Sequence, residues 1–163
     1  MTLKSGTNAD PVLPLRIIVR RPPPGVRFAM QRGPTATAEL VPPVSATADA
    51  LSFELDVRIG TPRGAAPLRL LGPFVHGAAD ARFLYVNSGQ LAGNAVSCWN
   101  RRAKIWLDGI TTELVDSVLA YPGAVLEAEV EGTARDGGPM CASTPLLADG
   151  WRLVHPVVGA ATR

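Results

Sequence analysis

The stretch from Asn87 to Lys104 holds the densest group of side chains suited to binding a ligand. Its sequence, NSGQLAGNAVSCWNRRAK, combines amides and hydroxyls with one tryptophan and three cations. Arginine guanidinium groups pair with carboxylate or phosphate oxygens through parallel hydrogen bonds. We therefore predict a non-catalytic binding site for a small anionic or polar ligand, with the indole as an apolar wall, formed by these residues: Asn87, Ser88, Trp99, Arg101, Arg102 and Lys104. The alternative is a long surface loop followed by a strand whose cations face water.

An enzyme with a cysteine nucleophile is the second hypothesis. Cys98 has the chemistry of a nucleophile if His76 or His155 lies beside it as a base. Buried cysteines are more often inert apolar side chains, and no family-specific catalytic motif surrounds this one. The two histidines with Cys98 and Cys141 match the ligand number of tetrahedral zinc, but their spacing lacks the close pairs that usually begin such a site. We therefore predict no catalytic residue, no metal site and no cofactor.

Glu127, Glu129 and Glu131 occupy alternate positions, so in a strand their side chains point to one face. Neighbouring carboxylates can bind a cation or transfer protons. A solvated strand face is the favoured interpretation, because a row of charges also discourages pairing between sheet edges.

The composition indicates one globular domain rich in turns. The chain has 163 residues, of which 47% are hydrophobic and 18% charged, with 16 glycines and 15 prolines. This length suits one domain with a core of its own, and the glycine and proline content argues against a helical bundle. We predict a flexible N-terminal tail over residues 1–12, a single β-rich domain over 13–156 and a C-terminal tail over 157–163.

Charge and hydropathy limit the expected partners. The net charge is only +2, and no strand interleaves aromatic with basic side chains, so nucleic acid is not an expected partner. Apolar runs are too short for a membrane span and no export signal is present, so we expect a soluble cytoplasmic protein without a membrane contact. A protein partner is an alternative to the small ligand. Basic residues predominate in 1–110 and acidic residues in 111–163, which leads to a third hypothesis, a structural self-association module.

Alternating apolar residues predict a mainly β fold. In Leu51–Ile59 apolar residues alternate with polar ones, which is the pattern of a strand with one buried face. Leu15–Arg20 and Val26–Gln31 show similar patterns and, joined by a proline-rich tip, predict a hairpin. Residues 82–87 and 102–107 also read as strands, and the stretch between them over 88–100 has no assignable pattern.

One short α-helix is expected at about residues 111–120. Thr111 or Thr112 provides an N-cap, and Pro122 with Gly123 ends the helix. Together with about eight short strands at roughly ten-residue spacing, this favours an antiparallel β-sandwich or a partly closed barrel over βαβ units.

Four separated motifs resemble a known family. They are GPFVHG (72–77), RFLYVNSG (82–89), SCWNRRAK (97–104) and GTARDGGP (132–139). In this order they resemble an uncharacterised bacterial family, domain of unknown function 5990, and the resemblance covers roughly residues 14–155. It implies a stand-alone bacterial domain. The family carries no known activity, ligand or catalytic residue, so the resemblance assigns no role to any position.

Overall fold

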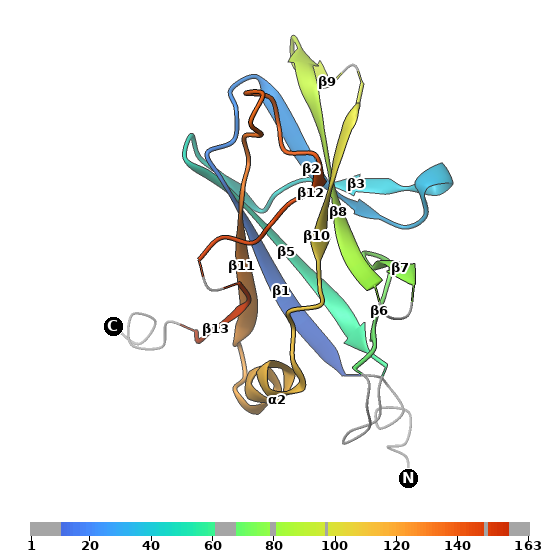
Figure 1. The fold of residues 1–163 in the computed structure, drawn as a ribbon, viewed down its shortest axis with the longest axis vertical. Helices are drawn as coiled ribbons and strands as arrows, with labels where there is room; N and C mark the ends of the chain where they lie inside the picture. Colours follow the sequence, from blue (N-terminus) through green and yellow to red (C-terminus); the bar gives the residue numbers. More distant parts are fainter. Residues whose placement is uncertain (1–10, 61–67, 79–80, 97, 149, 157–163) are drawn as a thin grey trace.

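The computed structural model describes residues 11–60, 68–78, 81–96, 98–148 and 150–156, and its strands form two sheets (Figure 1). The first, called the β1 sheet, has the order β13-β11-β1-β5-β4, with β6 paired to β5. The bounds of its strands are β1 Val12–Arg20, β4 Ser45–Ala46, β5 Ala50–Ile59, β6 Leu70–Leu71, β11 Val125–Glu131 and β13 Arg152–Val154.

The second sheet, called the β8 sheet, has the order β12-β10-β8-β2-β3, with β7 and β9 paired to β8. The bounds of its strands are β2 Val26–Arg32, β3 Glu39–Val41, β7 His76–Ala78, β8 Ala81–Ala92, β9 Ala95–Val96, β10 Arg101–Trp106 and β12 Ala142–Ser143. A 3-10 turn, η1 (Thr35–Thr37), lies between β2 and β3.

Each sheet turns one apolar face towards a shared core. The alternation over Leu51–Ile59 is confirmed, because β5 buries Phe53 and Val57 while Glu54 between them is exposed. Strands β1, β8, β10 and β11 contribute further apolar side chains to the same cluster. Burial of this alternating apolar surface is the main favourable term in folding, at about 25 cal/mol for each Å² removed from water.

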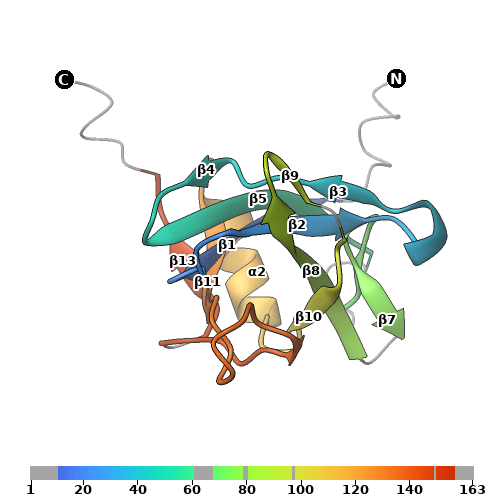
Figure 2. The same cartoon turned by 90° about the horizontal axis from the view of Figure 1, so that it is seen from above.

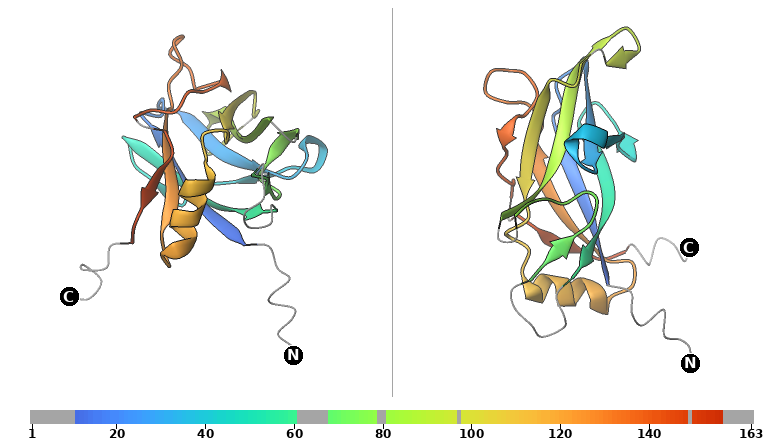
Figure 3. Two further views of the ribbon diagram at one scale, coloured as in Figure 1. Left: turned by 60° about the horizontal axis from the view of Figure 1, so that its bottom comes forward. Right: turned by 90° about the vertical axis from the view of Figure 1, so that its right-hand side faces the viewer.

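The predicted helix is confirmed as α2 (Thr112–Ala120). Thr111 is its N-cap, and the side-chain oxygen of Thr111 accepts a hydrogen bond from the backbone N–H of Leu114 at 3.2 Å. Val115 and Val118 are buried, and α2 contacts β1, β11 and β13. The helix lies across one end of the sandwich, between β11 on one side and β8 and β10 on the other (Figures 2 and 3). The described residues contain no helix that is both long and apolar enough to cross a membrane.

The sandwich prediction is confirmed with two refinements. Most strand pairs are antiparallel, but β1 pairs with β11 and β10 pairs with β12 in parallel, so both sheets are mixed. Neither sheet closes on itself within the described residues. The described residues form thirteen strands rather than about eight, and four of these have only two residues and leave no alternating pattern in the sequence.

The predicted hairpin of residues 15–20 and 26–31 is wrong. β1 lies in one sheet and β2 in the other, so the proline-rich connection crosses the sandwich. The reason is that β1 is hydrogen-bonded to β5 on one edge and β11 on the other, which leaves no edge for β2. The apolar faces of β1 and β2 meet across the core instead.

The unassigned stretch 88–100 is mostly strand. β8 continues to Ala92 and turns back through Gly93 and Asn94 into β9, with Leu91 opposite Val96. Gly93 has a φ of +70°, a conformation that glycine adopts without steric strain and that tight hairpin turns require. The predicted long loop is therefore reduced to a short connection before β10. The predicted tails lie outside the described residues, except that Pro11 is described and Val12 already begins β1.

Candidate functional site

A pocket of about 470 Å³ opens on the outer face of the β8 sheet, beside η1 and β3. Four of the six predicted site residues line it, and the other lining residues come from β2, the η1–β3 segment and the connection before β10. The complete lining is Gln31, Thr35, Ala38, Leu40, Asn87, Trp99, Asn100, Arg101 and Arg102.

Gln31 organises the floor of this pocket. Its Nε2 donates to the carbonyl oxygen of Gly33 at 3.4 Å and lies 3.5 Å from Thr35 Oγ1. Its Oε1 accepts hydrogen bonds from Asn87 Nδ2 at 3.1 Å and from Arg102 Nη1 at 3.4 Å. Because the donors and acceptors around Gln31 are fixed in this way, the amide group of Asn87 must turn its nitrogen towards Gln31.

Asn87 is left with an unused acceptor. The side chain is buried, with 8% of the residue exposed, and its Oδ1 has no hydrogen-bond donor within the described part of the chain. A buried polar atom without a partner costs about 1–3 kcal/mol, so such atoms are rare and usually have a reason. Here the unpaired oxygen belongs to a residue that lines a pocket.

Arg102 supplies positive charge at the same place. Its guanidinium carbon lies 4.1 Å from the ring centroid of Tyr85, within the range of a cation–π contact. Its two hydrogen bonds, to Gln31 Oε1 and to Thr35 Oγ1 at 3.3 Å, are long and both use Nη1. The residue is exposed, and none of its described contacts is with a carboxylate. Arg102 therefore keeps donor capacity for an anion.

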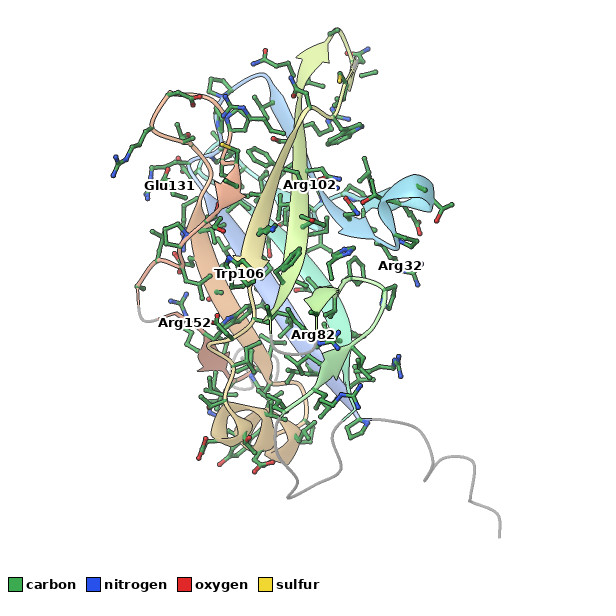
Figure 4. All side chains as sticks on the ribbon, turned by 45° about the vertical axis from the view of Figure 1, so that its right-hand side comes forward. Arg32, Arg82, Arg102, Trp106, Glu131 and Arg152 are labelled. Carbon is green, nitrogen blue, oxygen red and sulfur yellow. The ribbon has the colours of Figure 1, made fainter. Side chains whose placement is uncertain are left out.

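Lys104 lies further along the same face, outside the pocket. Its Nζ is 4.6 Å from the ring centroid of Phe83 and 5.6 Å from that of Trp106. In the β8–β10 pairing Asn87 lies opposite Arg102, Tyr85 opposite Lys104 and Phe83 opposite Trp106. This alternation of rings and cations across two strands is called the cation–aromatic strip and consists of Phe83, Tyr85, Arg102, Lys104 and Trp106. Figure 4 labels Arg102 and Trp106 on it.

His76 packs against the strip from β7. Its ring centroid is 4.7 Å from that of Tyr85, and its Nε2 lies 3.5 Å from the backbone oxygen of Gln31. Burial lowers the pKa of His76 below its ordinary value, and the nearby charge of Arg102 acts in the same direction. The neutral imidazole is therefore favoured, and it supports the position of Tyr85 without adding charge.

Arg101 is a predicted site residue whose charge is used elsewhere. Its Nη2 donates to Asp136 Oδ2 at 2.7 Å and its Nη1 to the carbonyl oxygen of Pro139 at 2.6 Å. The hydrogen bond from Arg101 holds the pKa of Asp136 below its ordinary value. Arg101 contributes to the pocket wall, while its guanidinium anchors the turn that contains Asp136.

Ser88 does not line the pocket. It follows the alternation of β8 in which Leu84 and Val86 are buried in the core, and only 1% of its surface is exposed. Its Oγ also lacks a partner among the described residues. We expected Asn87 and Ser88 to contribute to one site, whereas the extension of β8 beyond Asn87 sends neighbouring side chains to opposite faces.

Trp99 and Asn100 reach the pocket because β8 carries a glycine beneath them. A Cβ atom at Gly89 would collide with the carbonyl oxygen of Cys98 and with a methyl group of Val96. The connection that follows β9 can therefore cross β8 closely only at a residue without a side chain. Trp99 remains 37% exposed and forms an apolar side of the pocket.

The described residues place no histidine beside Cys98 and so do not support the cysteine-nucleophile or the zinc hypothesis. Cys98 and Cys141 are both exposed free thiols. In the described ranges His76 contacts aromatic rings and Gln31, and His155 stacks edge-on against Tyr121, so neither histidine is bonded to Cys98. No three histidine, cysteine, aspartate or glutamate side chains gather as a metal site there.

The three predicted glutamates share one face of β11, as expected, but each of them forms an ion pair with an arginine. Arg16 Nη1 donates to Glu127 at 3.1 Å, Arg20 Nε donates to Glu129 at 2.8 Å, and Arg21 pairs with Glu131. Arg152 on β13 bridges the first two of these carboxylates. The carboxylates therefore form neither the cation site nor the solvated strand face considered from the sequence. We call this set of ion pairs the arginine–glutamate network, and its residues are Arg16, Arg20, Arg21, Glu127, Glu129, Glu131 and Arg152.

Hydrogen bonds from Arg20 and Arg152 lower the pKa of Glu129 to about 2. The carboxylates of Glu127 and Glu129 are also the least exposed in the network, at 9% and 14% of their side-chain surfaces. The network is thus a structural feature of the β1 sheet, whereas the pocket is formed on the β8 sheet.

Sequence reasoning missed Gln31, Thr35 and Tyr85. Gln31 lies near the end of β2, and in the sequence its place in the alternation predicts a solvent-facing side chain, whereas the structure buries it. No sequence signal marks Thr35 or Tyr85 as a site residue, since their part in the site depends on which strands pair.

A family model described as a family of unknown function, DUF5990, matches residues 13–154 and so covers most of the chain. This range confirms the resemblance of the four sequence motifs, two of which supply Tyr85, Asn87, Trp99 and Arg102 to the site. No curated protein matches the chain, and no solved structure does. The chain belongs to the family of unknown function DUF5990.

Proposed function

We propose that the protein is a non-catalytic binding module whose pocket takes a small anionic ligand that also carries a hydrogen-bond donor. One observation carries the proposal. The buried acceptor Asn87 Oδ1, which has no donor in the described residues, belongs to the same pocket as Arg102, which has donor capacity and no carboxylate partner there.

Arg102 and Asn87 favour two different groups that one ligand can carry. Arg102 favours carboxylate or phosphate oxygens, which a guanidinium binds through more than one N–H. Asn87 Oδ1 favours an N–H or O–H group. A ligand with both groups would satisfy the pocket, and exclusion of water would strengthen both hydrogen bonds.

Trp99 adds a third expected property of the ligand, a flat or apolar part. The indole is partly exposed at the pocket wall, so a flat or apolar part of the ligand can cover it. Ser88 and the guanidinium of Arg101 have no part in the proposed site, because the first is buried and the second is bound to Asp136.

A metabolite screen by thermal shift tests the proposal. We expect hits among carboxylates or phosphates that carry a donor group, and we expect Asn87→Ala and Arg102→Ala to weaken each hit about tenfold, since each removes a hydrogen bond to a charged or buried group. Arg135→Ala is the matched control, because it removes an arginine that does not line the pocket. A hit whose affinity is the same in all three variants would not occupy this pocket, and the absence of any such pocket-dependent hit would end the proposal.

A further inference from the structure

The cation–aromatic strip continues the pocket and offers a flat positive platform. The Arg102 guanidinium covers the ring of Tyr85 at 4.1 Å, and Tyr85 also packs against His76 and Phe83, whose ring centroids lie 4.7 and 4.9 Å from its own. A guanidinium is planar, and its second face can stack on a further planar ring. Nucleic-acid bases stack on arginine planes and on aromatic side chains in this way.

Two cations on β10 have no carboxylate partner in the described part of the chain. Arg102 and Lys104 are two residues apart on the same face of a strand, so their Cα atoms are about 6.6 Å apart. The strands of the β8 sheet contain one carboxylate, Glu39 at the edge, and it pairs with Arg32 at 3.3 Å. The strip therefore suits a ligand with phosphates rather than a neutral one.

Asn87 adds a requirement for a donor. Its register partner on β10 is Arg102, so the unpaired Oδ1 belongs to the residue beside the platform. A base stacked on Arg102 presents ring or exocyclic N–H groups at its edge, and single-stranded RNA is read through such edges. A dicarboxylate or an acidic peptide would supply the charge but not the planar ring.

We infer that the ligand is a nucleotide unit, with its base on the Arg102–Tyr85 platform, a base N–H towards Asn87 and phosphate at Arg102 and Lys104. The inference rests on the proposed binding function and adds the ligand class. The sequence did not predict a nucleic-acid partner because no single strand interleaves aromatic and basic residues. Pairing of β8 with β10 creates that interleaving across two strands.

Isothermal titration with four probes tests the inference: inorganic phosphate, ribose 5-phosphate, uridine 5′-monophosphate and the pentanucleotide of uridine. We expect uridine monophosphate to bind at least about fivefold more tightly than ribose 5-phosphate, because stacking of one base contributes at least that much. Tighter binding of the pentanucleotide than of the mononucleotide identifies a nucleic-acid strand as the source of the unit. Equal binding of the two identifies a free nucleotide, and either result supports the inference.

Two matched pairs of variants locate the binding. Tyr85→Leu should bring the affinity of uridine monophosphate down to that of ribose 5-phosphate, while Tyr121→Leu, which changes an exposed tyrosine after α2, should have no effect. Lys104→Gln should weaken the pentanucleotide and reduce the slope of log affinity against log salt by about 0.7, the value for one phosphate contact on a single strand. Arg135→Gln should leave that slope unchanged. If Tyr85→Leu fails to fold, Lys104→Gln still tests the strip, because Lys104 is only half-buried and is not part of the core cluster.

Three results overturn the inference. The first is equal affinity for ribose 5-phosphate and uridine monophosphate. If that equal binding still depends on Arg102, it removes the base platform but leaves the proposed anion site in place. A hexaglutamate peptide that binds more tightly than the pentanucleotide shows selection for charge alone. If none of the four probes binds, the ligand is not a nucleotide unit, and the metabolite screen still decides the proposed binding function.

Discussion

The outer faces of the two sheets use arginine in opposite ways. On the β1 sheet, Arg16, Arg20 and Arg152 each bind a glutamate of β11. On the β8 sheet, Arg102 and Lys104 lie over aromatic rings. Both faces are rich in cations, but only the first provides each of these cations with a carboxylate. Figure 4 labels Arg152 and Glu131 for the first face and Arg102 and Trp106 for the second.

The comparison teaches where a charge stabilises the fold and where it remains available. A cation bound to a carboxylate has its donors occupied and little attraction for another anion. A cation over an aromatic ring gains a modest contact of about 0.5–1 kcal/mol at an exposed site and keeps most of its donors. We therefore propose that the first face stabilises the fold and that the second binds a ligand, and each prediction below tests that division.

The largest expected effect comes from Glu129 in the arginine–glutamate network. Glu129→Gln replaces one acceptor oxygen with an NH₂ group that faces Arg20 or Arg152, so the free energy of unfolding should fall by about 1.5–3 kcal/mol. Urea denaturation measures it. Glu54→Gln on the same face is the control, since that carboxylate is 53% exposed and pairs with Arg16 at 3.4 Å, and its loss should be under about 1 kcal/mol. Equal losses in the two variants would contradict a structural role for the network.

Acid should weaken the same face over a defined range. The pKa of Glu129 is about 2 in the folded protein and 4.5 as its ordinary value, so the folded state favours the charged form. The stability that this difference provides is complete above pH 4.5 and is lost as the pH falls towards 2, because the unfolded chain binds the proton first. Urea midpoints measured across this range should fall less steeply in Glu129→Gln than in the parent protein. Parallel curves would show that Glu129 does not carry the effect.

Removal of cations from the β8 sheet should change stability only slightly. Arg102→Ala and Lys104→Ala should each lower the free energy of unfolding by about 0.5–1 kcal/mol, the contribution of an exposed cation–π contact. The same urea experiment measures both variants. A loss as large as that of Glu129→Gln would mean that this face is structural as well, and the division between the two faces would fail.

The smallest effect is expected at Ser88. Its Oγ is buried without a partner among the described residues, so Ser88→Ala removes an unsatisfied group and should leave the free energy of unfolding unchanged or raise it by up to about 1 kcal/mol. Ligand affinity should not change, in contrast to Asn87→Ala one residue earlier. A lower ligand affinity in Ser88→Ala would contradict the assignment of the binding site to the face of β8 that carries Asn87.

Local patterns in the sequence predicted several elements well. The alternation of Leu51–Ile59 predicted β5, Thr111 and Pro122 bounded α2, and the spacing of the glutamates on β11 placed them on one face. Each of these depends on the periodicity or capping of a single segment. The candidate site was predicted in part for the same reason, because Asn87, Trp99 and Arg102 lie within one stretch of chain.

Contacts between distant segments could not be predicted in this way. Arg16 and Glu127 are 111 residues apart in the chain, and only the parallel pairing of β1 with β11 brings them together. Gln31 and Arg102 are likewise 71 residues apart and meet only because β2 and β10 both flank β8.

By itself the sequence determined which side chains turn to the core in strands with a clear alternation, such as β5, since backbone geometry alternates side chains with a period of two whatever the neighbouring strand. The tertiary structure alone decided which strands are neighbours, because that choice depends on how all the apolar faces and strand edges are satisfied at once. The pairing then decided that the glutamates of β11 meet arginines, whereas Arg102 and Lys104 of β10 meet aromatic rings.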